Sequence, residues 1–169
     1  FAANDSVNNE GNGVVFELSD TVKAVNNLIM DNSLKGMLVS CTGNVEIWNN
    51  TFVGNNGSLD VVQDERRASN LSAAGHDKRQ PLPDPTMPWI TKNVTLVNNV
   101  FSQSKGEAVI RVNDWSKEFK STDLLSKSEG NLFHTASSSL PIATWYPDAK
   151  KWTVYKTLAA YQSATGRDS

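Results

Sequence analysis

The sequence predicts an all-β solenoid of short parallel strands, and two observations lead to this prediction. Three segments carry an asparagine pair inside an apolar, strand-forming run: "VKAVNNLIM", "VEIWNNTFV" and "VTLVNNVFS". Glycines recur with them, since Gly13 and Gly36 are 23 residues apart and Gly36 and Gly57 are 21 apart. A period in the low twenties, without helical spacing of the apolar residues, is typical of stacked coils of strands.

The asparagine pairs at 26–27, 49–50 and 98–99 mark corners of the predicted coils. Strands usually exclude Asn, because its side-chain amide competes for backbone hydrogen bonds and favours turns. Asn tolerates the left-handed backbone conformation that a tight corner needs. We therefore expect one strand to end at each pair, and we expect the stacked amides to hydrogen-bond from coil to coil.

A second strand-forming block follows the glycine of each repeat. The blocks are "MLVSC" after Gly36, "SLDVVQD" after Gly57 and "EAVIRVND" after Gly106, and "NGVVFELSD" resembles the end of an earlier copy. We expect these blocks to lie side by side in one sheet, about 4.8 Å apart, with every second side chain facing outward.

The repeat is interrupted once. Gly57 and Gly106 are 49 residues apart, which corresponds to one coil plus an insertion at residues 65–91. The insertion contains prolines, two arginine-bearing clusters, a histidine and a tryptophan. Long excursions from a regular scaffold are often functional, so we expect an ordered loop laid along the face of the solenoid. The alternative is a solvated loop that only covers sheet edges.

The end of the chain departs from the repeat. Residues 134–169 are predicted to form an irregular segment and a cap, in which "TVYKTLAAYQSATG" becomes a short C-terminal helix that covers the last coil. Residues 1–169 are predicted to form a single domain. About four coils is short for a solenoid, so we expect the C-terminal part of a longer one, completed by missing N-terminal coils or by a second chain.

The coil pattern V-x-V-x-N-N-x-F-x-x-N-x-x-G resembles that of right-handed parallel β-helix proteins of the pectate-lyase-like kind, over roughly residues 8–133. That family includes polysaccharide lyases, glycoside hydrolases, epimerases, phage tailspikes and adhesins. The stretch from "NNTFVGN" to "DPTMPW" is similar to secreted bacterial β-helix proteins. The resemblance implies a right-handed parallel β-helix, a secreted or cell-surface location and carbohydrate as the partner.

Composition argues against other classes of function. The formal net charge is −2 and no basic stripe is present, so nucleic acid is not an expected partner. No apolar run has the length of a membrane-spanning helix, so no membrane partner is expected. The single cysteine, Cys41, lies in an apolar block, where we expect a buried packing role rather than a reactive thiol.

Aspartates on the outward side of the glycine-led strands are the candidate catalytic residues. Asp64 is the first candidate, with Asp60 or Asp114 as its partner. Asp64 and Asp114 belong to successive coils and can stack near 5 Å apart, where repulsion should raise one pKa and suit glycosidic cleavage. Strict register instead pairs Asp64 with Asn113. Asp60 and Asp64 lie about 13 Å apart in a straight strand, and strand-end aspartates also serve as turn formers.

Substrate-orienting groups are expected around these carboxylates. Arginine forms paired contacts with carboxylates, so Arg111 can orient a uronate, or can simply pair with Glu17 or an aspartate across the coils. Aromatic residues can stack on sugars or simply pack, and a loop histidine can shuttle protons or lie idle at the surface. The candidate substrate-binding residues are Arg67, Arg111, His76, Trp89, Trp115 and Glu17.

Together these observations predict a secreted enzyme acting on polysaccharides or oligosaccharides. Glycoside hydrolysis is preferred to lyase chemistry, because a lyase needs a strongly basic group or a calcium nest and the outward face is rich in acids. The alternative is a non-catalytic glycan-binding or structural surface or tail-fibre solenoid. No cofactor is expected, although a calcium site formed by Asp60, Asp64 and Asp114 stays open, since calcium prefers clustered oxygen ligands.

Overall fold

The computed structural model describes residues 1–77, 79, 84, 86–135, 137 and 139–169, and these are mostly β-structure in three sheets. The five-stranded sheet has the order β1(Asp5–Val7), β4(Leu28–Met30), β7(Thr51–Val53), β10(Val100–Ser102) and β13(Leu132–His134). The four-stranded sheet has the order β3(Asp20–Val25), β6(Gly43–Trp48), β9(Lys92–Val97) and β12(Leu125–Glu129). The six-stranded sheet has the order β2(Val14–Glu17), β5(Lys35–Ser40), β8(Gly57–Gln63), β11(Ile110–Asp114), β14(Ala143–Asp148) and β15(Lys151–Tyr155).

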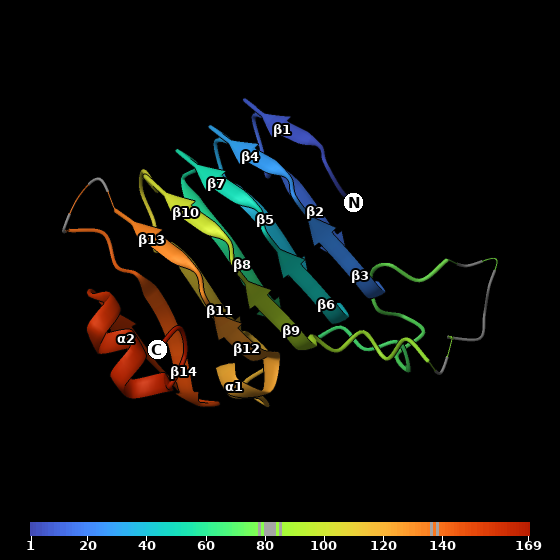
Figure 1. The fold of residues 1–169 in the computed structure, drawn as a ribbon. Coiled ribbons are helices and arrows are strands. Elements are labelled where there is room, and N and C mark those ends of the chain that lie inside the picture. The colour runs from blue at the N-terminus through green and yellow to red at the C-terminus, as the bar shows by residue number, and fades with distance from the viewer. Residues whose placement is uncertain (78, 80–83, 85, 136, 138) are drawn as a thin grey trace.

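The chain visits the three sheets in turn. It passes from β2 to β3 to β4 and then returns to the six-stranded sheet with β5, and we call each such pass a coil. Equivalent residues pair in parallel from coil to coil, as Val14 does with Met37 and Val22 with Val45. Successive coils lie next to one another in the order of the sequence, from the N-terminus toward the C-terminus (Figure 1). This arrangement of parallel sheets is compatible with the predicted solenoid.

The asparagine pairs lie at the corners between the four-stranded and five-stranded sheets, as predicted. The first member of each pair is left-handed, with φ of 57° at Asn26, 54° at Asn49 and 54° at Asn98. The second members Asn27, Asn50 and Asn99 form a ladder of amides that continues to Asn131, which follows Gly130, with contacts of 2.7, 3.0 and 2.9 Å. These side chains satisfy one another inside the stack, which explains why Asn occurs within an apolar run.

A second ladder, which the sequence reading did not identify, follows the strands of the five-stranded sheet. The amide of Asn9 donates to Asn32 at 2.7 Å, and the amide of Asn32 donates to Asn55 at 2.8 Å. Asn32 and Asn55 are almost fully buried. The coils that contain Asn9, Asn32 and Asn55 are therefore joined by hydrogen-bonded side chains at two successive corners.

The hydrophobic core lies between the three sheets. Phe52 and Phe101 stack with ring centroids 4.9 Å apart, and Phe101 stacks on Phe133 at 5.3 Å. In the six-stranded sheet, Val61 and Val112 are fully buried at paired positions, as the alternation of strand faces predicted. Repeated apolar positions thus become continuous stacks of like side chains.

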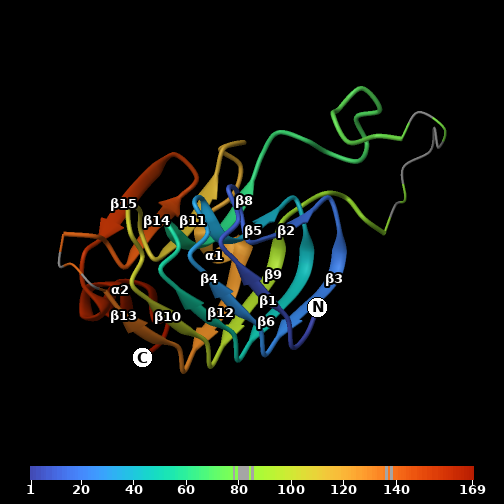
Figure 2. The same cartoon turned by 90° about the horizontal axis from the view of Figure 1, so that it is seen from above.

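Within the described residues of the insertion, residues 65–91, the chain forms turns and irregular structure between β8 and β9. Its two ends pack beside the coils, where Ala68 and Trp89 cover Cys41. Leu18 packs against the same cluster. Figure 2 shows the described green parts of this loop extending outward from the stack.

The C-terminal region is more regular than predicted. The stretch expected to be irregular contains β14 and β15, an antiparallel hairpin that extends the six-stranded sheet beyond β11. Ala143 and Trp145 alternate into the core, so the hairpin both buries apolar side chains and pairs with the exposed edge of β11. The expectation of an irregular segment was wrong for these residues.

Two helices accompany this region. The short α1(Ser121–Leu124) precedes β12, and α2(Leu158–Thr165) packs at the C-terminal end of the stack (Figure 1). The Thr157 side chain caps α2 at its start, Gly166 ends it with φ of 66°, and Tyr161 is fully buried against Trp145. The predicted C-terminal helix is confirmed. Neither of these helices, the ones found in the described residues, has the length and apolarity that crossing a membrane requires.

Candidate functional site

An open cavity of about 360 Å³ lies on the outer face of the six-stranded sheet, at β11 and the C-terminal hairpin. We call it the groove. The polar and aromatic side chains that line it are Glu107, Arg111, Asn113, Thr144, Tyr146 and Trp152. None of the described residues of the insertion belongs to this lining.

Strand register brings the polar residues of the groove together. Arg111 of β11 pairs with Asp60 of β8 on one side and with Thr144 of β14 on the other. Their neighbours Ile110 and Ala143 are fully buried, so alternation turns the polar row to the outer face. Residues far apart in the chain therefore form one continuous row.

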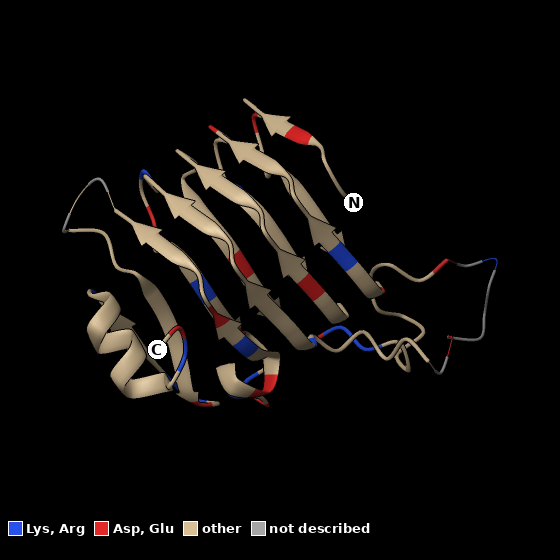
Figure 3. Ribbon diagram, viewed as in Figure 1, with Lys and Arg blue, Asp and Glu red and all other residues tan. Residues whose placement is uncertain are grey.

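Two ion pairs lie in this row and next to it. Asp60 is almost fully buried and forms an ion pair with Arg111. Glu107 forms an ion pair with Lys35, and its carboxylate lies 3.7 Å from Nη1 of Arg111. Figure 3 shows acidic and basic positions side by side on these neighbouring strands. Burial raises the pKa of Asp60, and the charges of Arg111 and Lys35 oppose that rise.

Three buried polar atoms in the groove have no hydrogen-bond partner among the described residues: Nε of Arg111, Oδ1 of Asn113 and Oγ1 of Thr144. Buried polar groups are nearly always paired, because an unpaired one loses the hydrogen bonds that water supplied. All three residues line the same cavity. These residues therefore border an open space and carry hydrogen-bonding atoms, buried beneath its surface, that an ordered water or a polar ligand could satisfy after a small side-chain movement.

The far wall of the groove is aromatic. Trp152 of β15 is 56 % exposed and lies beside Tyr146 of β14 in the lining. An exposed indole next to open hydrogen-bonding groups provides a flat apolar surface together with polar contacts. The sequence reading missed Glu107, Thr144, Tyr146 and Trp152, because the hairpin that brings three of them to β11 was not foreseen.

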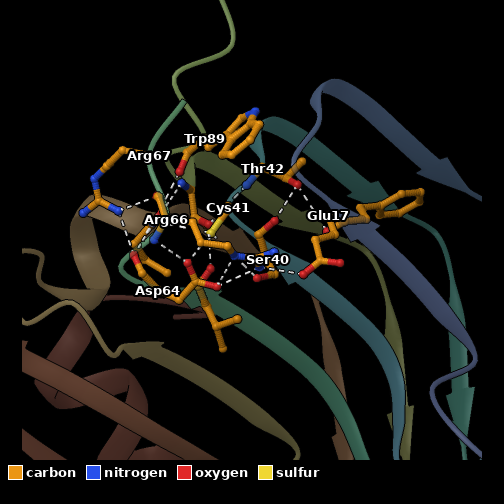
Figure 4. Close-up of polar contacts among 12 residues, drawn as sticks. Glu17, Ser40, Cys41, Thr42, Asp64, Arg66, Arg67 and Trp89 are labelled. Carbon is orange, nitrogen blue, oxygen red and sulfur yellow. Dashed lines mark hydrogen bonds and ion pairs between the residues drawn. The ribbon is translucent and has the colours of Figure 1, made fainter. Parts of the chain in front are cut away.

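Asp64, the first catalytic candidate, lies in a different cluster at the base of the insertion (Figure 4). Its carboxylate accepts hydrogen bonds from the backbone N–H of Arg66 at 2.8 Å, from Nε of Arg66 at 2.8 Å and from the thiol of Cys41 at 3.1 Å. Arg66 also contacts Glu17 at 2.6 Å. We call Glu17, Cys41, Asp64 and Arg66 the loop-base cluster.

The electrostatics of the loop-base cluster are those of a structural contact. Burial alone would raise the pKa of Asp64, but the hydrogen bonds and charge of Arg66 outweigh it and lower the pKa overall. Cys41 is fully buried, as predicted, and its pKa is raised by burial. Because each oxygen of Asp64 already has partners, the cluster anchors the insertion to the turn after β5.

Asp114 is not stacked on Asp64. The register pairs Asp114 with Gln63 and Asn113 with Val62, so the predicted pairing of Asp64 with Asn113 was also wrong. Asp114 accepts backbone N–H groups from Ser116 at 2.9 Å and from Glu118 and Phe119 at 2.6 Å each. It thus forms the turn after β11, which was the alternative reading of a strand-end aspartate.

The remaining predicted residues are dispersed around the insertion. Arg67 bonds the carbonyl oxygen of Asp64 at 2.7 Å and forms an ion pair with Glu118 at 2.7 Å. His76 lies on Trp89 with ring centroids 4.3 Å apart. Trp89 is 9 % exposed, so it packs under the loop rather than presenting a face to solvent.

Trp115 is half exposed just beyond β11, and its backbone N–H donates to the carbonyl oxygen of Gln63 at 2.8 Å. Of the predicted substrate-binding residues only Arg111 lines the groove, where it pairs with an aspartate across the coils, as one reading anticipated. In the part of the chain that the structure describes, no group of three or more histidine, cysteine or acidic side chains is arranged to hold a metal ion. The three aspartates considered for calcium enter separate networks.

Comparison with known proteins adds no relative. No family model, no curated protein and no solved structure matches this chain. The interpretation of the groove therefore rests on its residues and geometry.

Proposed function

We propose that this chain is a secreted, carbohydrate-active protein with a right-handed parallel β-helix of the pectate-lyase-like kind, and that the groove binds its sugar. One observation carries the proposal: Arg111, Asn113 and Thr144 all line one cavity, and each has a buried polar atom without a hydrogen-bond partner among the described residues. Sugars present hydroxyl groups to such atoms and apolar C–H faces to aromatic rings such as Trp152.

Glycoside hydrolysis is the reaction that we assign to the groove. Glu107 lies in the lining and is the carboxylate that faces a bound sugar. Asp60 lies almost fully buried behind Arg111, so in this proposal it serves as the acid of the pair only once its ion pair with Arg111 opens. In this proposal Glu107 and Asp60 replace Asp64 and Asp114 as the working pair. Lyase chemistry ranks lower, because Lys35 and Arg111 are engaged with carboxylates and a deprotonated base is needed.

A non-catalytic glycan-binding solenoid is the second candidate, and one observation favours it. Each carboxylate beside the groove is neutralised, Glu107 by Lys35 and Asp60 by Arg111. Groups held in ion pairs position a ligand well but are poor proton carriers until the pair opens. The same groove would then bind a sugar without cleaving it.

Product release from a panel of neutral and acidic polysaccharides separates these candidates, with reducing ends and unsaturated ends measured in parallel. We expect reducing ends without unsaturation, lost by about 100-fold or more in Glu107→Gln and Asp60→Asn. Glu129→Gln is the matched control, since Glu129 is an exposed carboxylate on β12. Asp64→Asn, tested alongside, retains activity if the groove is the site.

Each other outcome has a defined meaning. Unsaturated products would assign a lyase. Binding to the panel without any product would assign the glycan-binding solenoid. Loss of activity in Asp64→Asn with a normal fold would return the site to the loop-base cluster.

A further inference from the structure

We infer that the groove selects a neutral, hydroxyl-rich sugar unit and discriminates against uronates. This inference rests on the proposed function and specifies its substrate class. It differs from the sequence-based idea that Arg111 orients a uronate carboxylate, and three features of the groove lead to it.

The first feature is the charge balance of the groove. Glu107 and Arg111 line the groove, and each is paired with a buried residue of opposite charge, Glu107 with Lys35 and Arg111 with Asp60. Glu107 also lies 3.7 Å from Arg111. Binding a uronate through its carboxylate requires a cation with a free pair of donors. Here a uronate would have to displace Glu107 or Asp60, and would meet the negative charge of Glu107 in the lining.

The second feature is the type of hydrogen-bonding atom left open. Within the described residues, Oδ1 of Asn113 and Oγ1 of Thr144 are buried without partners, and both can accept a hydrogen bond. A carboxylate has no proton to donate to Oδ1 of Asn113 and can only accept from the hydroxyl group of Thr144, whereas a sugar hydroxyl group can donate to either atom. Nε of Arg111 adds one donor to this set. A sugar unit with adjacent hydroxyl groups can satisfy both kinds of atom.

The third feature is the apolar wall. Trp152 of β15 lines the groove, and Pro141 and Ala108, which precede β14 and β11, add further apolar surface. The exposed indole of Trp152 can cover the C–H face of a pyranose ring while the hydroxyl groups at the ring edge reach the polar row. An apolar ring surface next to polar residues whose charges are paired suits an uncharged polar ligand.

Calorimetric titration of the full chain tests the inference, with cello-, manno- and xylo-oligosaccharides compared with oligogalacturonate of equal length. We expect a neutral oligosaccharide to bind at least about tenfold more tightly than oligogalacturonate, with a Kd that changes less than about twofold between roughly 20 and 300 mM salt. Tighter binding of oligogalacturonate, weakened by salt, would overturn the inference and leave the proposed function intact. Binding of no oligosaccharide would remove the proposed function and the inference with it.

Two variants locate the preference in the groove. Thr144→Val removes Oγ1 while nearly keeping the shape of the side chain, and it should raise the Kd of the neutral oligosaccharide about fivefold. Glu107→Gln releases Lys35 and Arg111, so the affinity for oligogalacturonate should rise while that for the neutral ligand changes less. Trp48→Ala, on the outer face of the four-stranded sheet, is the control. An unchanged preference in folded Glu107→Gln would contradict the charge argument.

Discussion

The groove and the loop-base cluster use similar residues on the same sheet, yet they are built in opposite ways. In the loop-base cluster, Asp64 accepts hydrogen bonds from Arg66 and Cys41, and Arg66 continues to Glu17. In the groove, the ion pair between Asp60 and Arg111 leaves Nε of Arg111 without a partner among the described residues. A saturated network holds a loop in place, whereas an unsaturated network beside a cavity has contacts left for a ligand.

Replacing Arg111 in the groove and Arg66 in the loop-base cluster should give the largest difference between the two sites. Arg111→Met should lower the free energy of unfolding by about 3 kcal/mol, because it leaves Asp60 buried without its ion-pair partner. Arg66→Met should cost about 1 kcal/mol, because its partners Glu17 and Asp64 have side chains that are 45 % and 20 % exposed and keep contact with water. Urea unfolding followed by circular dichroism measures both.

The double variant Asp60→Leu with Arg111→Met serves as the control for that prediction. It removes both charges and should recover most of the loss. Equal destabilisation by the two single arginine variants would contradict the distinction between a buried pair and an exposed one.

Two threonines test the difference between saturated and open atoms. Oγ1 of Thr42 donates to the carbonyl oxygen of Ser40 at 2.8 Å, so Thr42→Val should cost about 1 kcal/mol of unfolding free energy. Thr144→Val removes an atom that has no partner within the described structure, and should leave stability unchanged or raise it by up to about 1 kcal/mol. Thermal unfolding measures the two shifts.

A result in which both threonine variants lose the same stability would show that Thr144 is as well satisfied as Thr42. The groove would then lack the unpaired hydrogen-bonding atom on which the proposed function rests. Loss of sugar binding without loss of stability in Thr144→Val would strengthen that proposal.

The two aspartates should also differ in the pH dependence of stability, which is the smallest of the expected effects. Asp64 has a lowered pKa in the folded chain, so its contribution is present above the ordinary value of 3.8 and is lost as pH falls through its folded pKa. Asp60 has a raised pKa, so its contribution is greatest below 3.8 and declines as pH rises through its folded pKa.

Unfolding free energies of the parent, Asp64→Asn and Asp60→Asn between pH values of about 2 and 7 give the two slopes. The parent should gain stability relative to Asp64→Asn as pH rises, and should lose stability relative to Asp60→Asn. Slopes of the same sign would show that the two carboxylates share one environment.

Local pattern was sufficient for the repeated part of the fold. The left-handed backbone at Asn26, Asn49 and Asn98 follows from residue type and spacing, as does the burial of Val61 and Val112. The register between successive coils was harder to predict. Asp114 pairs with Gln63 and therefore misses Asp64 by one residue. This register is set by the hydrogen bonds and side-chain packing of all the strands in the sheet, and a short sequence segment does not reveal it.

Strands that return to the same sheet about every 23 residues, the polar corners, the insertion and the C-terminal helix were all predicted from the amino-acid sequence. They could be predicted because they depend on local conformational preference and on the period of the apolar residues. Tertiary structure decided the groove. Asp60, Arg111 and Thr144 become neighbours only through strand pairing, and Trp152 reaches them because β15 folds back on β14. Such contacts join residues distant in the chain, and their partners depend on which edges and apolar faces remain to be covered.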